Sequence, residues 1–236
     1  MASEDNTKTI AITGASSGIG REIALELATS GHSFILIGRN GERLQEVQKE
    51  VASLGGMAIL GIGDVANEED VDNLYSKIQQ HYGKVDVLVA NAGVGHFGNL
   101  EDLSIQQFDE QFNTNVRGVF LWLRKVLPEM KQRNSGQIIV TSSNLGLKTS
   151  ARASIYSATK HAVQAMVWSL RDELKGTYVK AATINPGSVD TPWFDGKDVD
   201  RSTMLSARDV AKAVRLIIDQ SESSNIDHIH IMPGKR

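Results

Sequence analysis

Residues 9–20 read Thr9-Ile-Ala-Ile-Thr-Gly-Ala-Ser-Ser-Gly-Ile-Gly20, an apolar run followed directly by three closely spaced glycines. A buried strand, a glycine turn and a helix over residues 19–30 together form the pattern of a nucleotide-binding loop. Gly14 permits a tight turn, Gly18 a close approach of the backbone to a ligand, and Gly20 close packing of the helix. Exposed amides and the positive end of the helix would then hold a pyrophosphate.

We therefore expect this loop to contact a nucleotide cofactor through Gly14, Ser16, Ser17, Gly18, Ile19 and Gly20. The alternative is a plain strand-to-helix turn that binds nothing. The spacing is not that of a Walker A loop, because no Gly-Lys-Ser or Gly-Lys-Thr follows the glycines.

Apolar strand-like runs and amphipathic helical runs alternate along the rest of the chain. Strands are predicted at residues 9–13, 33–37, 57–62, 85–90, 137–141, 179–184 and 228–232, and helices at 19–30, 42–53, 68–81, 104–113, 116–133, 156–174 and 207–219. Strands that are apolar on both faces indicate a parallel sheet with helices on both sides. Right-handed crossovers then favour a Rossmann-type doubly wound sheet of about seven strands.

We expect a single α/β domain over residues 1–236, because no linker, repeat or low-complexity segment interrupts the alternation. Ligands bind beyond the carboxyl ends of the strands in such a sheet. Residues 190–206 carry few periodic signals and are predicted to form a lid over the substrate.

The end of the second predicted strand bears on the choice of cofactor. NAD requires an acidic residue there to bind a ribose hydroxyl. The chain instead reads Ile37-Gly38-Arg39-Asn40, with no carboxylate and with an arginine whose guanidinium suits a 2′-phosphate. This favours NADP(H), the alternative being that Arg39 is a solvated surface charge.

The stretch Ser154-Ile-Tyr-Ser-Ala-Thr-Lys-His161 opens another predicted helix and places Tyr156 four residues before Lys160. Residues i and i+4 share one helix face, so the phenol and the ammonium should project into the same space. A tyrosine has a pKa of about 10, and a fixed cation nearby favours its phenolate. The pair is therefore a candidate acid–base centre, although this spacing also arises by chance.

The composition excludes several classes of protein. Hydrophobic residues make up 41% of the 236 residues, the net charge is −3 and there is no cysteine, so neither disulfides nor thiolate chemistry are possible. No basic stripe indicates nucleic acid, and no apolar run is long enough to cross a membrane. The six histidines show no metal-ligand spacing. The first eight residues are polar and lack a signal-peptide core, so we expect a cytoplasmic protein.

Taken together, these motifs resemble the short-chain dehydrogenase/reductase family over nearly the whole chain. The motifs are, in order, Thr13-Gly14-x3-Gly18-x-Gly20, Asp64-Val65, Asn91-Ala92-Gly93, Asn115, Ser143, Tyr156-x3-Lys160 and Pro186-Gly187. Ala90 stands where the family often has a first asparagine, which is a common variant.

The resemblance implies hydride transfer between NADP(H) and a carbonyl or alcohol. Tyr156 would be the general acid or base, and Lys160 would lower its pKa and hold the nicotinamide ribose. Ser143 would polarise the substrate oxygen; it is preferred to Ser142 because it begins the family's Ser-x-x-Gly pattern. Asn115 would bind a water that links Lys160 to solvent.

The resemblance also implies further cofactor contacts and an assembly. The contacts are Asp64 and Val65 beside the adenine, Asn91, Ala92 and Gly93 along the cofactor, Pro186 and Gly187 beside the nicotinamide, and Val189 and Thr191 at its carboxamide. A homodimer or homotetramer would form through the helices that span residues 115–133 and 156–174.

Residues after the strand ends should shape the substrate pocket. We expect contacts from His96 and Phe97, from Leu145 and Leu147, and from Trp193 and Phe194. The last two side chains would either cap an apolar substrate or pack the lid onto the body. His96 is alternatively incidental, and Arg152 is alternatively a carboxylate anchor or a surface charge.

Three other functions compete with a carbonyl reductase. Reduction of a 3-oxoacyl thioester is disfavoured by the ending His228-Ile-His-Ile-Met-Pro-Gly-Lys-Arg236, which lacks a Gly-Gly motif and resembles members that act on small hydroxy acids, amino-acid alcohols or diverse ketones. A non-catalytic NADP(H)-binding regulator would have no need of the proton relay. A sugar-nucleotide epimerase would need a longer substrate domain.

Overall fold

The computed structural model describes residues 7–234, so most of the polar N-terminal stretch and the last two residues lie outside it. The strands are β1 (Thr9–Thr13), β2 (Ser33–Gly38), β3 (Met57–Ile62), β4 (Val87–Ala90), β5 (Gly136–Thr141), β6 (Val179–Pro186), β7 (Val189–Asp190), β8 (Leu205–Ser206) and β9 (His228–Ile231). The helices are α1 (Gly18–Ala28), α2 (Gly41–Ser53), α3 (Glu68–Tyr82), α4 (Ile105–Phe112), α5 (Gly118–Gln132), α6 (Ser154–Glu173) and α7 (Ala207–Ile218).

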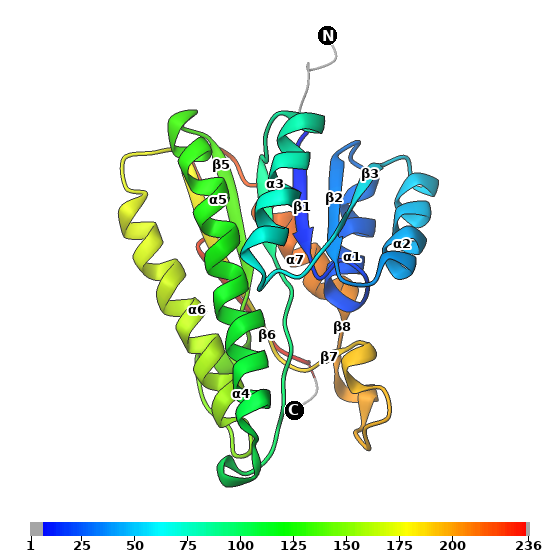
Figure 1. Cartoon of the computed structure of the whole chain (residues 1–236), viewed down its shortest axis with the longest axis vertical. Coiled ribbons are helices and arrows are strands. Elements are labelled where there is room, and N and C mark those ends of the chain that lie inside the picture. The colour runs from blue at the N-terminus through cyan, green and yellow to red at the C-terminus, as the bar shows by residue number, and fades with distance from the viewer. Residues whose placement is uncertain (1–6, 235–236) are drawn as a thin grey trace.

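Seven strands form one sheet in the order β3-β2-β1-β4-β5-β6-β9, and every neighbouring pair is parallel. The order reverses between β1 and β4, where Ile10 pairs with Val87 and Ile12 with Val89. The predicted doubly wound α/β sheet is therefore confirmed (Figure 1). A crevice beyond the carboxyl ends of β1 and β4 follows from this reversal.

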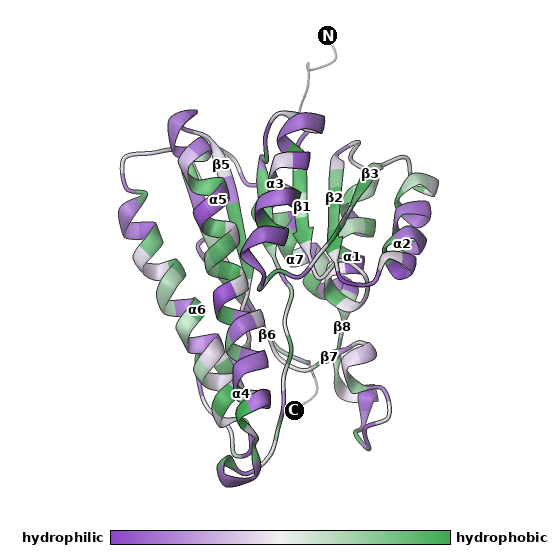
Figure 2. Cartoon of the chain, in the orientation of Figure 1, coloured by the Kyte–Doolittle hydropathy of each residue, from purple (hydrophilic) through white to green (hydrophobic). Residues whose placement is uncertain are grey.

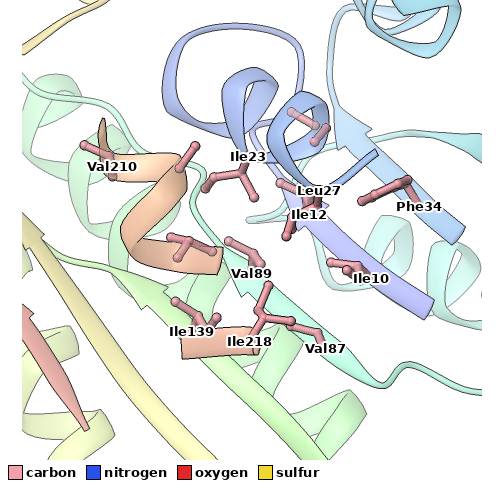
Figure 3. Packing of buried hydrophobic residues seen from close by; sticks show 14 of the residues in the cluster. Ile10, Ile12, Ile23, Leu27, Phe34, Val87, Val89, Ile139, Val210 and Ile218 are labelled. Atoms are coloured by element: carbon pink, nitrogen blue, oxygen red, sulfur yellow. The ribbon is translucent and has the colours of Figure 1, made fainter. Parts of the chain in front are cut away.

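Helices cover both faces of the sheet, because side chains on both faces are apolar. On one face α1, α2 and α7 pack on the strands, and Ile23, Leu27 and Ile218 meet Ile12 and Val89 there (Figure 3). On the other face α3, α5 and α6 pack on the strands around a second cluster of buried residues. The strands β1, β2 and β3 are mostly hydrophobic, whereas the helices alternate in character (Figure 2).

The structure corrects the prediction of two separate helices at residues 104–113 and 116–133. α4 runs through a five-residue π turn, Asn113–Arg117, directly into α5. The polar run Asn-Thr-Asn looks like a break in the sequence pattern, but a π turn keeps the backbone helical while shifting the hydrogen-bond register. The turn buries Asn115 almost completely.

A second difference lies in the segment predicted as a lid. β7 and β8 pair in parallel at its two ends, with Val189 opposite Leu205 and Asp190 opposite Ser206. Strands of two residues carry no period of their own, so the sequence gives no signal for them. Residues 190–206 are called the lid segment below.

We expect Phe34→Ala to destabilise the fold, because the Phe34 side chain in β2 is fully buried in the first core cluster. The free energy of unfolding should fall by about 3–5 kcal/mol, measured by urea unfolding followed by circular dichroism. Tyr178→Ala is the control, since Tyr178 is 66% exposed; it should change stability by roughly 0.5 kcal/mol or less. Equal losses in both variants would contradict the assigned core.

Candidate active site

A cavity of about 980 Å³ opens beyond the carboxyl ends of the central strands. Its wall is formed by the glycine loop after β1, the ends of β2, β3, β4 and β5, the start of α6, the loop after β6 and the lid segment. The topological reversal therefore places the chemically notable side chains around one space.

The glycine loop has the shape that the sequence indicates. Gly14 and Gly18 have φ of +67° and +54°, in the left-handed region that other residues rarely adopt. A Cβ on Gly20 would lie 2.3 Å from the carbonyl oxygen of Gly14, so α1 can approach the loop only with glycine there. Gly20 packs beneath the loop and does not line the cavity, whereas Gly14, Ser16, Ser17, Gly18 and Ile19 do.

Hydrogen bonds tie the ends of β1 and β4 together beside the loop. The Thr13 hydroxyl accepts hydrogen bonds from the backbone amides of Asn91 and Ala92, at 2.9 and 3.0 Å. The Asn91 side-chain amide donates to the Thr13 carbonyl at 3.1 Å. Asn91, Ala92 and Gly93 also line the cavity, so this segment both fixes the two strand ends and forms part of the wall.

Tyr156 and Ser143 lie together at one end of the cavity. Burial raises the pKa of Tyr156 to about 12, and interaction with the Ser143 side chain opposes the rise. Ser143 is thus the serine beside the phenol, whereas the hydroxyl of Ser142 donates to the Lys160 carbonyl at 3.2 Å. The lowered pKa expected for Tyr156 is not what the chain's own groups produce, because removal from water disfavours the phenolate.

Lys160 is buried beneath the same end of the cavity. Its ammonium donates to the Thr141 carbonyl at the end of β5, at 2.9 Å, and lies 5.7 Å from the centre of the Tyr156 ring. Burial lowers the pKa of Lys160 to about 8, because the charged form loses its hydration. The ammonium therefore stays mostly protonated at neutral pH, one helical turn from the phenol.

Asn115 does not line the cavity. Its side-chain amide donates to the Val94 carbonyl at 2.8 Å and to the Thr159 hydroxyl at 3.0 Å, and its oxygen accepts from the Val94 amide at 2.8 Å. The side chain thus binds the π turn to the loop after β4 and to α6. A Cβ on Gly93 would lie 3.4 Å from the Asn115 oxygen and 3.6 Å from the Lys160 ammonium, so these groups are close neighbours.

Two arginines flank the other end of the cavity. Arg39 follows β2, as the sequence indicates, and Arg43 lies in the first turn of α2. Both side chains are exposed. Sequence reasoning missed Arg43, although its place at the start of the predicted helix, directly after a strand end where ligands bind, is a signal for it. Asp64 lines this end, which continues into a hollow of about 530 Å³.

The loop after β6 closes the cavity between these two ends. Pro186, Gly187, Val189 and Thr191 all line it. The Gly187 amide donates to the Ile231 carbonyl of the neighbouring strand β9 at 2.8 Å. A Cβ on Gly18 would lie 3.3 Å from the Thr191 side chain, so the start of the lid segment rests against the glycine loop.

Aromatic side chains surround Tyr156 at the predicted substrate end. The Phe97 and Trp193 rings have centroids 5.3 and 5.9 Å from that of Tyr156. Phe194, Leu145 and His96 also line the cavity, and His96 Nε2 lies 2.7 Å from a carboxylate oxygen of Glu110 on α4. Leu147 and Arg152 do not line it, which favours the interpretation of Arg152 as a surface charge.

The comparison with known proteins decides the family. A model of the short chain dehydrogenase family matches residues 8–201. The chain belongs to the short-chain dehydrogenase/reductase family. An uncharacterized oxidoreductase of Staphylococcus epidermidis is 34% identical over 226 residues, which cover 96% of this chain and 97% of that protein. The chain is therefore an oxidoreductase of this family.

Solved structures of other members share the architecture. An alcohol dehydrogenase from the archaeon Thermococcus sibiricus, complexed with 5-hydroxy-NADP, superposes with a TM-score of 0.91 at 30% identity, over 98% of both chains. A 3-ketoacyl-ACP reductase from Sinorhizobium meliloti superposes with a TM-score of 0.85 at 31% identity, over 96% of this chain and 98% of the other. Membership in this family implies a nicotinamide cofactor.

Within residues 7–234, no helix has the length and apolar character needed to cross a bilayer. Among the same residues, no three histidine, cysteine, aspartate or glutamate side chains gather where they could share a metal ion.

We expect Lys160→Met to stabilise the protein at pH 7 by about 3 kcal/mol, because a buried ammonium is removed. The folded pKa of Lys160, about 8, lies below its ordinary value of 10.5. The unfolded chain therefore binds the Lys160 proton more tightly than the folded protein does. The resulting loss in the free energy of unfolding is largest below pH 8 and disappears as the pH rises to 10.5.

The gain in stability of Lys160→Met should accordingly shrink between pH 8 and pH 10.5, as measured by urea unfolding at several pH values. Lys212→Met on α7 is the control, because Lys212 is exposed and should show no such trend. A gain that does not depend on pH, or a loss at every pH, would contradict the lowered pKa.

Proposed function

We propose that the protein is an NADP(H)-dependent oxidoreductase that transfers a hydride between nicotinamide and a carbonyl or alcohol group. The observation that carries this proposal is the meeting of Tyr156, Ser143 and Lys160 at one end of a cavity that also takes in the glycine loop and, at its other end, Arg39 and Arg43. Proton donors at one end, a phosphate cradle in the middle and guanidinium groups at the other end suit a dinucleotide that lies along the cavity.

The chain's own residues fit such a cofactor. Gly14 and Gly93 both line the cavity, so no side chain projects from these positions into the space where the cofactor would lie. Gly14, Ser16, Ser17, Gly18 and Ile19 would hold the pyrophosphate, and Pro186, Gly187, Val189 and Thr191 would border the nicotinamide. The bound cofactor supplies the hydride.

The protein's share of the chemistry is electrostatic and acid–base. Negative charge grows on the substrate oxygen during reduction, and Ser143 and Tyr156 would donate hydrogen bonds to it there. A pKa of about 12 keeps Tyr156 protonated at neutral pH, the form that carbonyl reduction requires. The phenolate formed after proton transfer would be stabilised by the Lys160 ammonium, and the π turn at Asn115 would provide the route that reprotonates it.

Preference for NADP(H) is supported by charge at the adenosine end. Arg39 and Arg43 line the cavity there, and no carboxylate stands directly after β2. Two guanidinium groups can bind a 2′-phosphate by charge-assisted hydrogen bonds, which a free ribose hydroxyl cannot match. The complex of the Thermococcus sibiricus relative with an NADP derivative agrees with this preference.

Reduction of a 3-oxoacyl thioester is the second candidate, and the Sinorhizobium meliloti relative favours it. A panel of ketones, hydroxy acids and acyl thioesters, followed by NADPH absorbance, separates the two. A single domain, a lid at residues 190–206, a homodimer or homotetramer and a cytoplasmic location remain proposals beside this function.

Tyr156→Phe tests the enzyme against a binding-only regulator. We expect turnover of NADPH to fall by roughly 10²- to 10⁴-fold, because the proton donor is lost while the ring is kept. NADPH affinity, measured by isothermal titration calorimetry, should stay within about threefold, a difference of under 1 kcal/mol. Tyr178→Phe is the control, and unchanged turnover in Tyr156→Phe would refute the assigned role.

Arg39→Asp tests the cofactor preference. The carboxylate should repel a 2′-phosphate and accept hydrogen bonds from a ribose hydroxyl, so kcat/KM for NADPH should fall and that for NADH should rise. The ratio of the two should change by roughly a hundredfold, equivalent to about 2.7 kcal/mol. Arg208→Asp on α7, outside the cavity wall, should leave the ratio unchanged. Equal use of both cofactors by the unmodified protein would overturn the assignment.

A further inference from the structure

We infer that Lys197 in the lid segment selects substrates that combine an apolar body with a carboxylate, so that the preferred carbonyl compounds are hydrophobic keto acids. This inference rests on the proposed function and names the substrate class of the same site. It does not follow from a motif, because Lys197 lies in an irregular stretch between two short helical turns.

Three aromatic rings surround the Lys197 ammonium. The nitrogen lies 5.8 Å from the ring centroid of Phe97, 5.7 Å from that of Trp193 and 5.5 Å from that of Phe194. A cation within about 6 Å of a ring face is attracted by the ring's quadrupole. The Lys197 side chain is exposed, and these contacts favour a position of its ammonium on the cavity wall beside the rings.

Two of these rings also cover the proposed proton donor. Phe97 and Trp193 approach Tyr156 from the loop after β4 and from the lid segment, respectively. A Cβ on Gly95 would lie 2.6 Å from the Trp193 ring and 3.0 Å from Tyr156, so the three rings pack closely around this glycine. Phe97 and Trp193 therefore each contact both the Lys197 ammonium and the Tyr156 ring, so a single aromatic ring lies between the two groups on each route.

The two charged side chains that line this end of the cavity are both lysines, and the nearby Glu110 carboxylate is paired with His96 outside the lining. Lys160 and Lys197 both line this end, and the only carboxylate among the described lining residues is Asp64, next to the adenosine end. The neighbouring cation of the lid segment behaves differently, because Arg201 is paired with Asp190 and Asp195. Within residues 7–234, Lys197 forms no ion pair.

These observations describe a substrate with two parts. Flat apolar surfaces of Phe97 and Trp193 suit an aryl or alkyl body, and a positively charged wall whose lining carries no carboxylate at this end attracts an anion and disfavours a cation. The Lys197 ammonium has three hydrogens, so one can be donated to a substrate carboxylate while the nitrogen stays in contact with the ring faces. The ketone carbon accepts the hydride and its oxygen accepts the proton of Tyr156, so the carboxylate takes no part in bond formation.

A pair of matched substrates tests the inference. NADPH oxidation is measured with 4-acetylbenzoate and with 4-acetylbenzamide, which share the aryl ketone but differ in charge. The quantity compared is the ratio of kcat/KM for the acid to kcat/KM for the amide. We expect the unmodified enzyme to favour the acid, and Lys197→Met, which keeps an unbranched apolar stem, to lower the ratio by roughly tenfold.

Two further variants and the ionic strength sharpen the result. Lys197→Arg should retain most of the preference, because the charge and the contact with the rings are kept. Lys212→Met, a change at an exposed lysine of α7, should leave the ratio unchanged. The preference should also weaken as salt is raised from about 0.01 to 0.5 M, because screening shortens the reach of the charge.

The outcomes separate this inference from the proposed function. If Lys197→Met lowers activity equally on both substrates, Lys197 only packs the lid segment and the inference is wrong. The same holds if the unmodified enzyme shows no preference or favours the amide. Binding of 4-(1-hydroxyethyl)benzoate with NADP⁺, followed by calorimetry, does not require turnover. If it binds in a Lys197-dependent way while neither ketone is reduced, the anion site is supported and the proposed reaction is refuted.

Discussion

The site depends on one buried charge, the ammonium of Lys160 bonded to the Thr141 carbonyl at the end of β5. An ammonium is costly to remove from water, so the rest of the fold has to hold it there. The apolar contacts of α6 with the sheet, through residues such as Val163 and Val167, do so. A group kept at that cost in a cavity wall is typical of a functional site.

The burial that lowers the pKa of Lys160 also raises that of Tyr156, and the two effects suit reduction. The phenol stays protonated at neutral pH, and in the proposed reaction the neighbouring ammonium would stabilise the phenolate that forms when the proton is donated. If the lysine alone lowered the pKa of the tyrosine to neutral pH, the phenol would instead be partly ionised before the substrate arrived. Burial therefore acts before proton transfer, by keeping Tyr156 protonated, and Lys160 would act after it, by stabilising the phenolate.

Charge is divided between the two ends of the cavity. Arg39 and Arg43 stand where a phosphorylated ribose would lie, and Lys160 and Lys197 stand where a carbonyl substrate would lie. The glycine loop between them contributes backbone dipoles without side-chain charge. Under the proposed function, such a distribution would orient a dinucleotide and a charged substrate in the cavity, because the positive groups at each end would attract a different anionic group. The aromatic rings at one end then restrict which organic groups can enter.

The sequence by itself determined the features that depend on residues close together in the chain. Glycines at positions 14 and 18 were needed for left-handed backbone, the strand–helix alternation indicated the parallel sheet, and the spacing of Tyr156 and Lys160 put both on one helix face. Only the tertiary structure decided the remaining features of the site, because these depend on contacts between segments that lie far apart in the sequence. It joined α4 to α5 through the π turn, turned Asn115 toward Val94, and brought Phe97 and Lys197 together. It also set the pKa of Tyr156 by burial, which no spacing along the chain specifies.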